Sequence, residues 1–150
     1  MLTPEERLEQ LEAIFLDLEF ASETTPIIVE GKKDAEALAM LGITKNVITL
    51  SKGMSLFTFS ENISRRSTKA VVLTDWDRKG GHLARLLKEA LMNNGVVVDN
   101  RLRAQLATLS KKEVKDIESL PRFVDRLRQL AEIGLGRHSQ LRSYKKIHGK

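Results

Sequence analysis

The amino-acid sequence predicts an α/β fold in which a parallel sheet is covered by helices on both faces. Short apolar, β-branched runs recur along the chain, helical patterns separate them, and acidic residues follow several of them. Continuous apolar runs are typical of strands buried on both faces, and their alternation with helices is typical of parallel sheets. With 150 residues, the chain has room for one domain with a substantial core.

The first element is expected to be a packing helix within residues 1–22. Thr3 suits the N-cap, Pro4 suits the first helical position, and Glu6 would complete a capping box. Apolar side chains then recur at helical spacing at Leu8, Leu11, Phe15 and Leu18. This helix is therefore expected to pack on a central domain, residues 23–136.

Four strands and their connecting helices are expected in that domain. The strands are predicted at residues 27–29, 46–50, 70–74 and 96–98. The helices are predicted at about 33–41, 54–63, 81–92 and 101–109, and from 119 or 120 onward. Gly42 is a suitable C-cap for the first of these, and near Gly134 and Gly136 the last pattern dissolves into a basic tail, residues 137–150.

Acidic residues follow three of the predicted strands. Glu30 follows the first, Asp75 and Asp77 follow the third, and Asp99 follows the fourth. In open parallel sheets, ligands bind beyond the carboxyl ends of the strands, where the strand order reverses. The first and third strands should therefore be neighbours in the order 2-1-3-4, and the acids predict a metal site at this edge.

The segment 74–80 contains the most informative acids. If the extended backbone persists through Trp76, Asp75 and Asp77 point the same way and can share one hard cation. Carboxylate oxygens suit Mg²⁺, and Mn²⁺ could substitute for it. An Asx-rich turn that closes the strand is the alternative. Trp76 would either pack against the body or offer a stacking face to a base.

Two further acids and four bases border this segment. Glu30 ends a buried strand, where a carboxylate should be partnered, exposed in a cleft or bound to metal. Asp34 lies early in the following helix and either caps that helix or joins the metal site. The bases could neutralise phosphate or could be solvated charges at loop ends: Lys32, Lys33, Arg78 and Lys79.

Composition excludes several other chemistries. The absence of cysteine excludes disulfides, thiolate zinc sites and cysteine nucleophiles, and three histidines make a histidine-rich metal site improbable. No apolar stretch approaches a membrane span and no signal-peptide pattern begins the chain, so the expected location is the cytoplasm without a membrane partner.

Charge is unevenly distributed along the chain. Residues 1–20 carry six acids and one base, whereas residues 137–150 carry five bases and no acid. A basic tail is typical of a nucleic-acid-binding arm, here formed by Arg137, Arg142, Lys145, Lys146 and Lys150. The alternative is that Leu141, Tyr144 and Ile147, at helical spacing, anchor the tail on the body.

With Glu30–Gly31 after the first strand and Asp75–Trp76–Asp77 after the third, the chain resembles a Toprim domain over about residues 25–99. The whole-chain layout is most similar to the small stand-alone Toprim proteins of archaea and some bacteria. The resemblance implies a three-layer α/β/α, Rossmann-like fold. It also implies a general acid/base role for Glu30 and a metal-binding pair, Asp75 and Asp77. Asp34 matches an acid of the primase-like branch, and Asp99 loosely matches a further ligand.

A second stretch, residues 111–118, resembles a late motif of the Toprim branch that matures 5S ribosomal RNA. Glu118 lies at the acidic position of that motif, but Lys115 and Asp116 replace small residues. The alternative is an ordinary loop into the last helix.

These residues favour chemistry on phosphodiesters, which is the chemistry of the Toprim family. Tyr144, the only tyrosine, lies in the basic tail, so a topoisomerase is improbable; primase action would need further domains. A glycine-rich P-loop is not formed around Gly31–Lys32. The sequence therefore predicts a Mg²⁺-dependent nuclease for structured RNA or DNA, with possible partners in a processing complex. The alternative is a non-catalytic module that binds nucleic acid or a nucleotide within a larger complex.

Overall fold

The computed structural model describes the backbone of residues 1–110 and 112–148, and the side chains of residues 1–110 and 112–134. The strands are β1 (Ile27–Val29), β2 (Val47–Thr49), β3 (Lys69–Val72) and β4 (Val97–Asp99). The helices are α1 (Pro4–Ser22), α2 (Lys32–Met40), α3 (Leu56–Ser64), α4 (Arg78–Asn93), α5 (Arg101–Ser110) and α6 (Leu120–His148). None of the helices in the described residues is long and apolar enough to cross a membrane.

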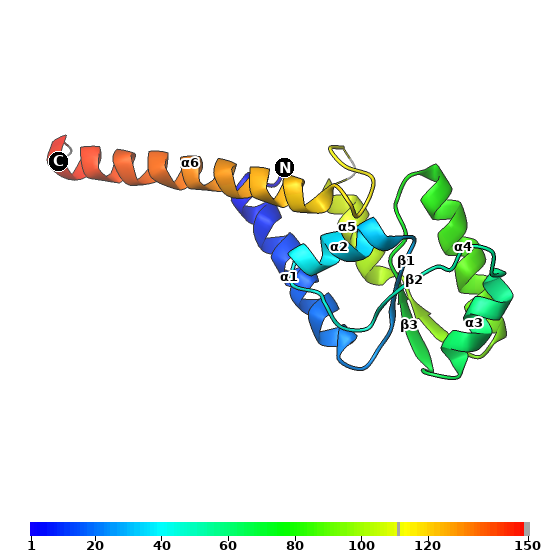
Figure 1. The fold of residues 1–150 in the computed structure, drawn as a ribbon. Coiled ribbons are helices and arrows are strands. Elements are labelled where there is room, and N and C mark those ends of the chain that lie inside the picture. The colour runs from blue at the N-terminus through cyan, green and yellow to red at the C-terminus, as the bar shows by residue number, and fades with distance from the viewer. Residues whose placement is uncertain (111, 149–150) are drawn as a thin grey trace.

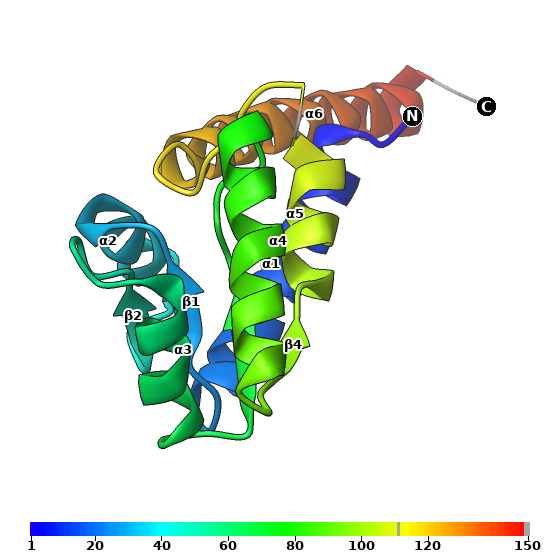
Figure 2. The ribbon, with the colours of Figure 1, turned by 90° about the vertical axis from the view of Figure 1, so that its right-hand side faces the viewer.

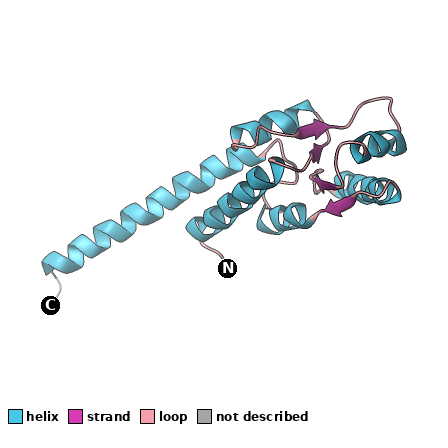
Figure 3. Cartoon of the chain, turned by 90° about the horizontal axis from the view of Figure 1, so that it is seen from below, coloured by secondary structure: helices cyan, strands magenta, loops and turns pink. Residues whose placement is uncertain are grey.

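The four strands form one parallel sheet in the order β2-β1-β3-β4, as the positions of the acids predicted. Ile27 pairs with Val47 on one side and with Val71 on the other, and Val71 also pairs with Asp99. The strands lie between α3 and α4 on one side and the remaining helices on the other (Figure 3). The predicted three-layer α/β fold is therefore confirmed.

Alternating side chains of the central strands build two separate cores. Ile27, Val29 and Val71 face a core that they share with α1, α2, α5 and α6. Ile28 and Val72 face a smaller core under α3 and α4. Because both faces are covered, β1 and all of β3 after Lys69 are buried, which explains the continuous apolar runs in their sequences.

The predicted ends of two helices are confirmed. Thr3 and Glu6 form the capping box of α1, with bonds of 3.1 and 3.2 Å between each side chain and the other residue's backbone N–H. Gly42 follows α2 with φ of +95°, the left-handed conformation that a glycine C-cap adopts.

The structure corrects two predicted boundaries. β3 ends at Val72 and α4 begins at Arg78, so extended strand geometry does not continue through Trp76. The last helix does not dissolve near Gly134 and Gly136: α6 continues to His148 and projects beyond the body of the domain (Figure 1). Each glycine costs a helix only about 1 kcal/mol, and strong helix formers flank both positions.

Candidate functional site

The carboxyl ends of β1 and β3 meet at one edge of the sheet, and their acids are in direct contact. The backbone N–H of Asp75 donates a 2.9 Å hydrogen bond to Oε2 of Glu30. Just before it, the N–H of Leu73 donates to the carbonyl of Ile28, which extends the strand pairing up to this edge. The neighbouring strand ends therefore bring together two acids that are 45 residues apart in the sequence.

Asp75 is the most strongly perturbed acid among the described residues. Burial is the main cause that raises the pKa of its carboxyl to about 7, and the charges of Asp34, Glu30 and Asp116 act in the same direction. A hydrogen bond of 3.0 Å from the N–H of Ile117 to Oδ1 opposes this rise. Neighbouring carboxylates that raise one another's pKa are a common feature of functional sites.

Asp34 belongs to the same group of acids. Its Oδ2 accepts a 3.1 Å hydrogen bond from the N–H of Gly31, so the predicted capping role is present. The residue is also only 8% exposed, and burial raises the pKa of its carboxyl, assisted by the charges of Glu30, Glu118 and Asp116. An ordinary cap does not need to be buried among other acids, so capping alone does not account for Asp34.

Asp77 and Asp99 both lie at helix starts. Asp77 is the N-cap of α4, and its Oδ1 accepts a 2.7 Å hydrogen bond from the N–H of Gly80. Asp99 Oδ1 accepts a bond from the N–H of Arg101, and its Oδ2 lies 3.8 Å from the Arg101 guanidinium. Asp77 is therefore positioned by a helix cap, not by strand alternation, and Asp99 pairs with α5.

Arg103 of α5 is a site residue that the sequence did not reveal. Its Nε donates to the carbonyl of Thr74 at 2.9 Å and its Nη2 to the carbonyl of Asp75 at 2.7 Å. Burial lowers the pKa of its guanidinium, whereas the charges of Asp75, Glu30 and Asp77 raise it. Three of the five predicted acids therefore act on one half-buried cation, the Arg103 guanidinium. No local pattern marks Arg103, because its role depends on where α5 passes the sheet.

The loop between α5 and α6 also borders the site. Trp76 donates from its backbone N–H to the carbonyl of Lys115 and from its indole Nε1 to that of Val114, both at 2.9 Å. The indole packs against the larger core, which is the first of the two predicted alternatives. Together with the Ile117 contact, these bonds bring Asp116 and Glu118 close enough to affect Asp34. Residue 111, the start of the motif compared above, lies outside the described residues.

Gly80 allows the first turn of α4 to pack directly against the backbone that follows β3. A Cβ at this position would overlap the carbonyl group of Asp75, and Thr74 Oγ1 donates to the carbonyl of Gly80 at 2.9 Å. The adjacent Gly81 has room, because its nearest neighbour would be the Arg103 guanidinium at 3.7 Å. The two glycines therefore have different roles, and only Gly80 is required by close backbone approach.

Four predicted phosphate-binding bases are exposed beside these acids. Lys32 and Lys33 lie in the first turn of α2, and Arg78 and Lys79 lie in the first turn of α4. Both helices begin at the carboxyl edge of the sheet, where their N-terminal dipoles also favour anions. The side chains of Arg137, Arg142, Lys145, Lys146 and Lys150, and of the proposed anchors Leu141, Tyr144 and Ile147, lie outside the described residues.

The side chains in this site carry oxygen atoms, which are the ligands that a hard divalent cation prefers. Glu30, Asp34, Asp75 and Asp77 are all carboxylates, and each uses one named oxygen in a hydrogen bond to a backbone N–H. Within the residues that the structure describes, no three acids, histidines or cysteines are gathered closely enough to hold a metal ion. One or two carboxylates are enough for Mg²⁺, which usually completes its coordination with water and substrate oxygens.

This fold and site define a Toprim-type α/β domain: a 2-1-3-4 parallel sheet, a glutamate after the first strand and an Asp-Trp-Asp segment after the third. Residues 25–109 match the Toprim domain family, and the chain belongs to it. Membership implies a metal-binding function related to nucleic acids.

The chain is also similar to several small archaeal proteins. It is 42% identical over 123 residues to a UPF0292 protein of Methanosarcina acetivorans, an alignment that covers 81% of this chain and 85% of that protein. It is 32% identical over 122 residues to a UPF0292 protein of Methanocaldococcus jannaschii, covering 81% and 95%. A solved structure, a putative protein from Aquifex aeolicus, matches with a TM-score of 0.62 and 31% identity over 71% of this chain and 94% of that one.

Proposed function

We propose that this protein is a Mg²⁺-dependent nuclease that hydrolyses phosphodiesters in structured RNA or in DNA. The observation that carries the proposal is the contact between Glu30 and the backbone of Asp75, beside a carboxyl whose pKa is raised to about 7. Groups whose pKa values lie near neutrality are suited to proton transfer and to cation binding. The chain would act alone or with protein partners in a processing complex.

In this proposal, Asp75 and Asp77 would hold Mg²⁺, with Mn²⁺ as a substitute, and Asp34 would support the same site. The metal, when bound, would stabilise the negative charge on the attacking and leaving oxygens. Glu30 would act as the general acid/base. Its Oε2 is held by the N–H of Asp75, which fixes the carboxylate at the strand edge. Lys32, Lys33, Arg78 and Lys79 would bind the phosphates on either side of the reacting one.

The contrasting function is a non-catalytic module that binds nucleic acid or a nucleotide. One observation favours it: the exposed bases in the first turns of α2 and α4 could bind phosphates without any bond being broken. The two functions differ in whether phosphodiester bonds are broken.

A cleavage assay distinguishes these functions. The purified protein would be incubated with a panel of single-stranded, duplex and hairpin RNAs and DNAs, with Mg²⁺, with Mn²⁺ or with EDTA. We expect metal-dependent cleavage that falls at least about a hundredfold in Glu30→Gln, the usual scale for a lost general acid/base, while binding affinity is retained. Glu61→Gln is the matched control, because that glutamate pairs with Arg65 on α3 and is not a proposed site residue. Binding without cleavage of any substrate would favour the non-catalytic module.

A further inference from the structure

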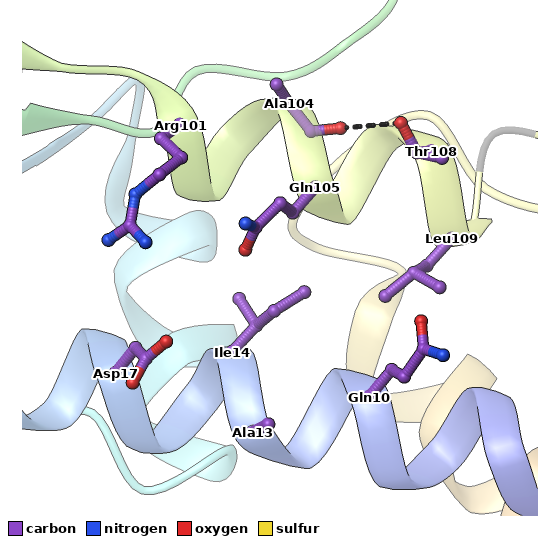
Figure 4. A pocket seen from close by; sticks show the side chains of 9 residues that line it. All are labelled: Gln10, Ala13, Ile14, Asp17, Arg101, Ala104, Gln105, Thr108 and Leu109. Carbon is purple, nitrogen blue, oxygen red and sulfur yellow. Dashed lines mark hydrogen bonds between the residues drawn. The ribbon is translucent and has the colours of Figure 1, made fainter.

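Helices α1 and α5 pack together on the opposite side of the sheet from α3 and α4 (Figure 2), and a groove runs between them. Its volume is about 530 Å³, and apolar side chains line much of it, among them Ala13 and Ile14 of α1 and Leu109 of α5. Figure 4 shows Asp17 and Arg101 on the two walls at the same end of the groove. The groove is thus an apolar channel with one charge of each sign at one end.

An exposed apolar stripe continues this surface along α1. Ala13, Leu16, Asp17 and Phe20 are spaced i, i+3, i+4 and i+7, so they share one face of the helix. This face differs from the one that packs into the core, which contains Leu11, Ile14, Phe15 and Leu18. Leu16 is 65% exposed and Phe20 is 82% exposed. The helix therefore carries a second apolar face that the described residues do not cover.

The exposed end of α1 shows which side of the molecule this surface occupies. Phe20 lies near the end of α1, immediately before β1 begins, so this end of the surface faces the amino ends of the strands. A partner bound here would leave the carboxylates at the opposite edge accessible. Exposed apolar patches of this kind mark protein interfaces.

Charge argues for a second copy as the occupant. A twofold interface is self-complementary, so the Asp17 side of one protomer can face the Arg101 side of the other. Arg101 is exposed, and its ion pair with Asp99 is long, at 3.8 Å, so its guanidinium can turn to a new partner. Nucleic acid is a poor occupant, because the groove offers a single base, Arg101, to neutralise phosphates, and Asp17 lies opposite it.

We propose that the α1/α5 groove, with the exposed side chains of Leu16 and Phe20, is the interface of a symmetric homodimer of this chain. This inference is independent of the proposed nuclease activity, since none of the residues that line the groove is a proposed catalytic or metal-binding residue.

Sedimentation equilibrium and light scattering after gel filtration test the interface. The parent is expected to be dimeric, and Phe20→Ser should weaken association at least about tenfold, because burial of a large aromatic side chain is lost. Phe57→Ser on α3 is the matched control: Phe57 is also exposed, at 57%, but lies over the other core. Both variants change exposed residues, and a circular dichroism melt checks that each is folded.

A charge swap provides an independent test of the same arrangement. Asp17→Arg and Arg101→Asp should each weaken the dimer, because like charges then face one another. Asp17 and Arg101 also lie opposite one another within a protomer, so the two single variants are then mixed. The mixture should recover most of the association, because opposite charges then meet only between the two kinds of protomer. A monomeric parent over about a hundredfold range of concentration would overturn the proposal. Equal effects of Phe20→Ser and Phe57→Ser, or a mixture that associates no better than either single variant, would overturn it as well.

Discussion

Replacing Asp75 by asparagine should stabilise the metal-free protein at neutral and alkaline pH. Burial, together with the charges of Asp34, Glu30 and Asp116, raises the pKa of Asp75 from 3.8 to about 7 in the folded state. Between these two values the folded protein retains a proton that the unfolded chain has released. The free energy of unfolding should therefore fall as the pH rises from about 4 to about 7, and the full loss should persist above pH 7.

The magnitude follows from the size of the pKa change. A rise of about three pKa units corresponds to about 4 kcal/mol, at 1.36 kcal/mol for each unit. Because the Asp75 carboxyl is only partly buried, solvent screening reduces this value, and we expect about 1 to 2 kcal/mol. Asparagine has nearly the same shape, and its side-chain oxygen can still accept the hydrogen bond from Ile117.

Urea denaturation in EDTA, at pH values of about 5 and 8, measures this effect. The advantage of Asp75→Asn over the parent should be larger at the higher pH, whereas the control Asp99→Asn should show no such gain. With Mg²⁺ at about ten times its dissociation constant, the parent should gain about 1.4 kcal/mol and the double variant Asp75→Asn/Asp77→Asn should gain nothing. A variant less stable than the parent at pH 8, or an advantage that does not change with pH, would refute the electrostatic argument.

Three further changes test other parts of the site. Gly80→Ala should lower the free energy of unfolding by about 2 kcal/mol or more, since a Cβ at this position overlaps the Asp75 carbonyl. In the same denaturation assay, the control Gly81→Ala should be neutral or slightly stabilising. Arg103→Met should lower the free energy of unfolding in EDTA, because the carbonyls of Thr74 and Asp75 lose their hydrogen-bond donor. It should also weaken or abolish the rise in melting temperature caused by Mg²⁺, because the Asp75 backbone loses its position. An unchanged rise would mean that Arg103 supports only the fold. Deleting residues 137–150 should weaken nucleic-acid binding and flatten the plot of log affinity against log salt by roughly 2 to 4 units; a lower melting temperature with an unchanged slope would favour the anchor instead.

The strand order and the contact between Glu30 and Asp75 could be predicted because the relevant signals are local. Buried parallel strands are continuous apolar runs, and ligands in such sheets lie at their carboxyl ends. This rule alone was enough to predict that Glu30 and Asp75 lie close together. The capping box of Thr3 and Glu6 was predictable for the same reason, since both partners lie within one turn.

The remaining features depend on contacts between distant segments. The side chain of Asp77 was expected to point the same way as that of Asp75, as in an extended strand. Instead, the close packing of Gly80 on the Asp75 carbonyl allows a helix to begin there, and Asp77 is its N-cap. Arg103 reaches the site because α5 passes beside the third strand end, and no pattern within α5 encodes that path. The length of α6 was underestimated because two glycines were interpreted as a helix end, although their neighbours favour helix.

The contacts of Asp75 show how the site separates positioning from charge. Its N–H donates to Glu30, its carbonyl accepts from Arg103, and both contacts hold the backbone at the strand edge. Its carboxylate, by contrast, lies among acids that oppose its ionisation. Natural proteins retain such unfavourable groupings chiefly where function requires them, because uncharged residues of similar size would be more stable. The backbone contacts do not need the carboxylate, and an asparagine could accept the hydrogen bond from Ile117 equally well, so the fold gives no reason for the charge; the positively charged ligand proposed above would account for it.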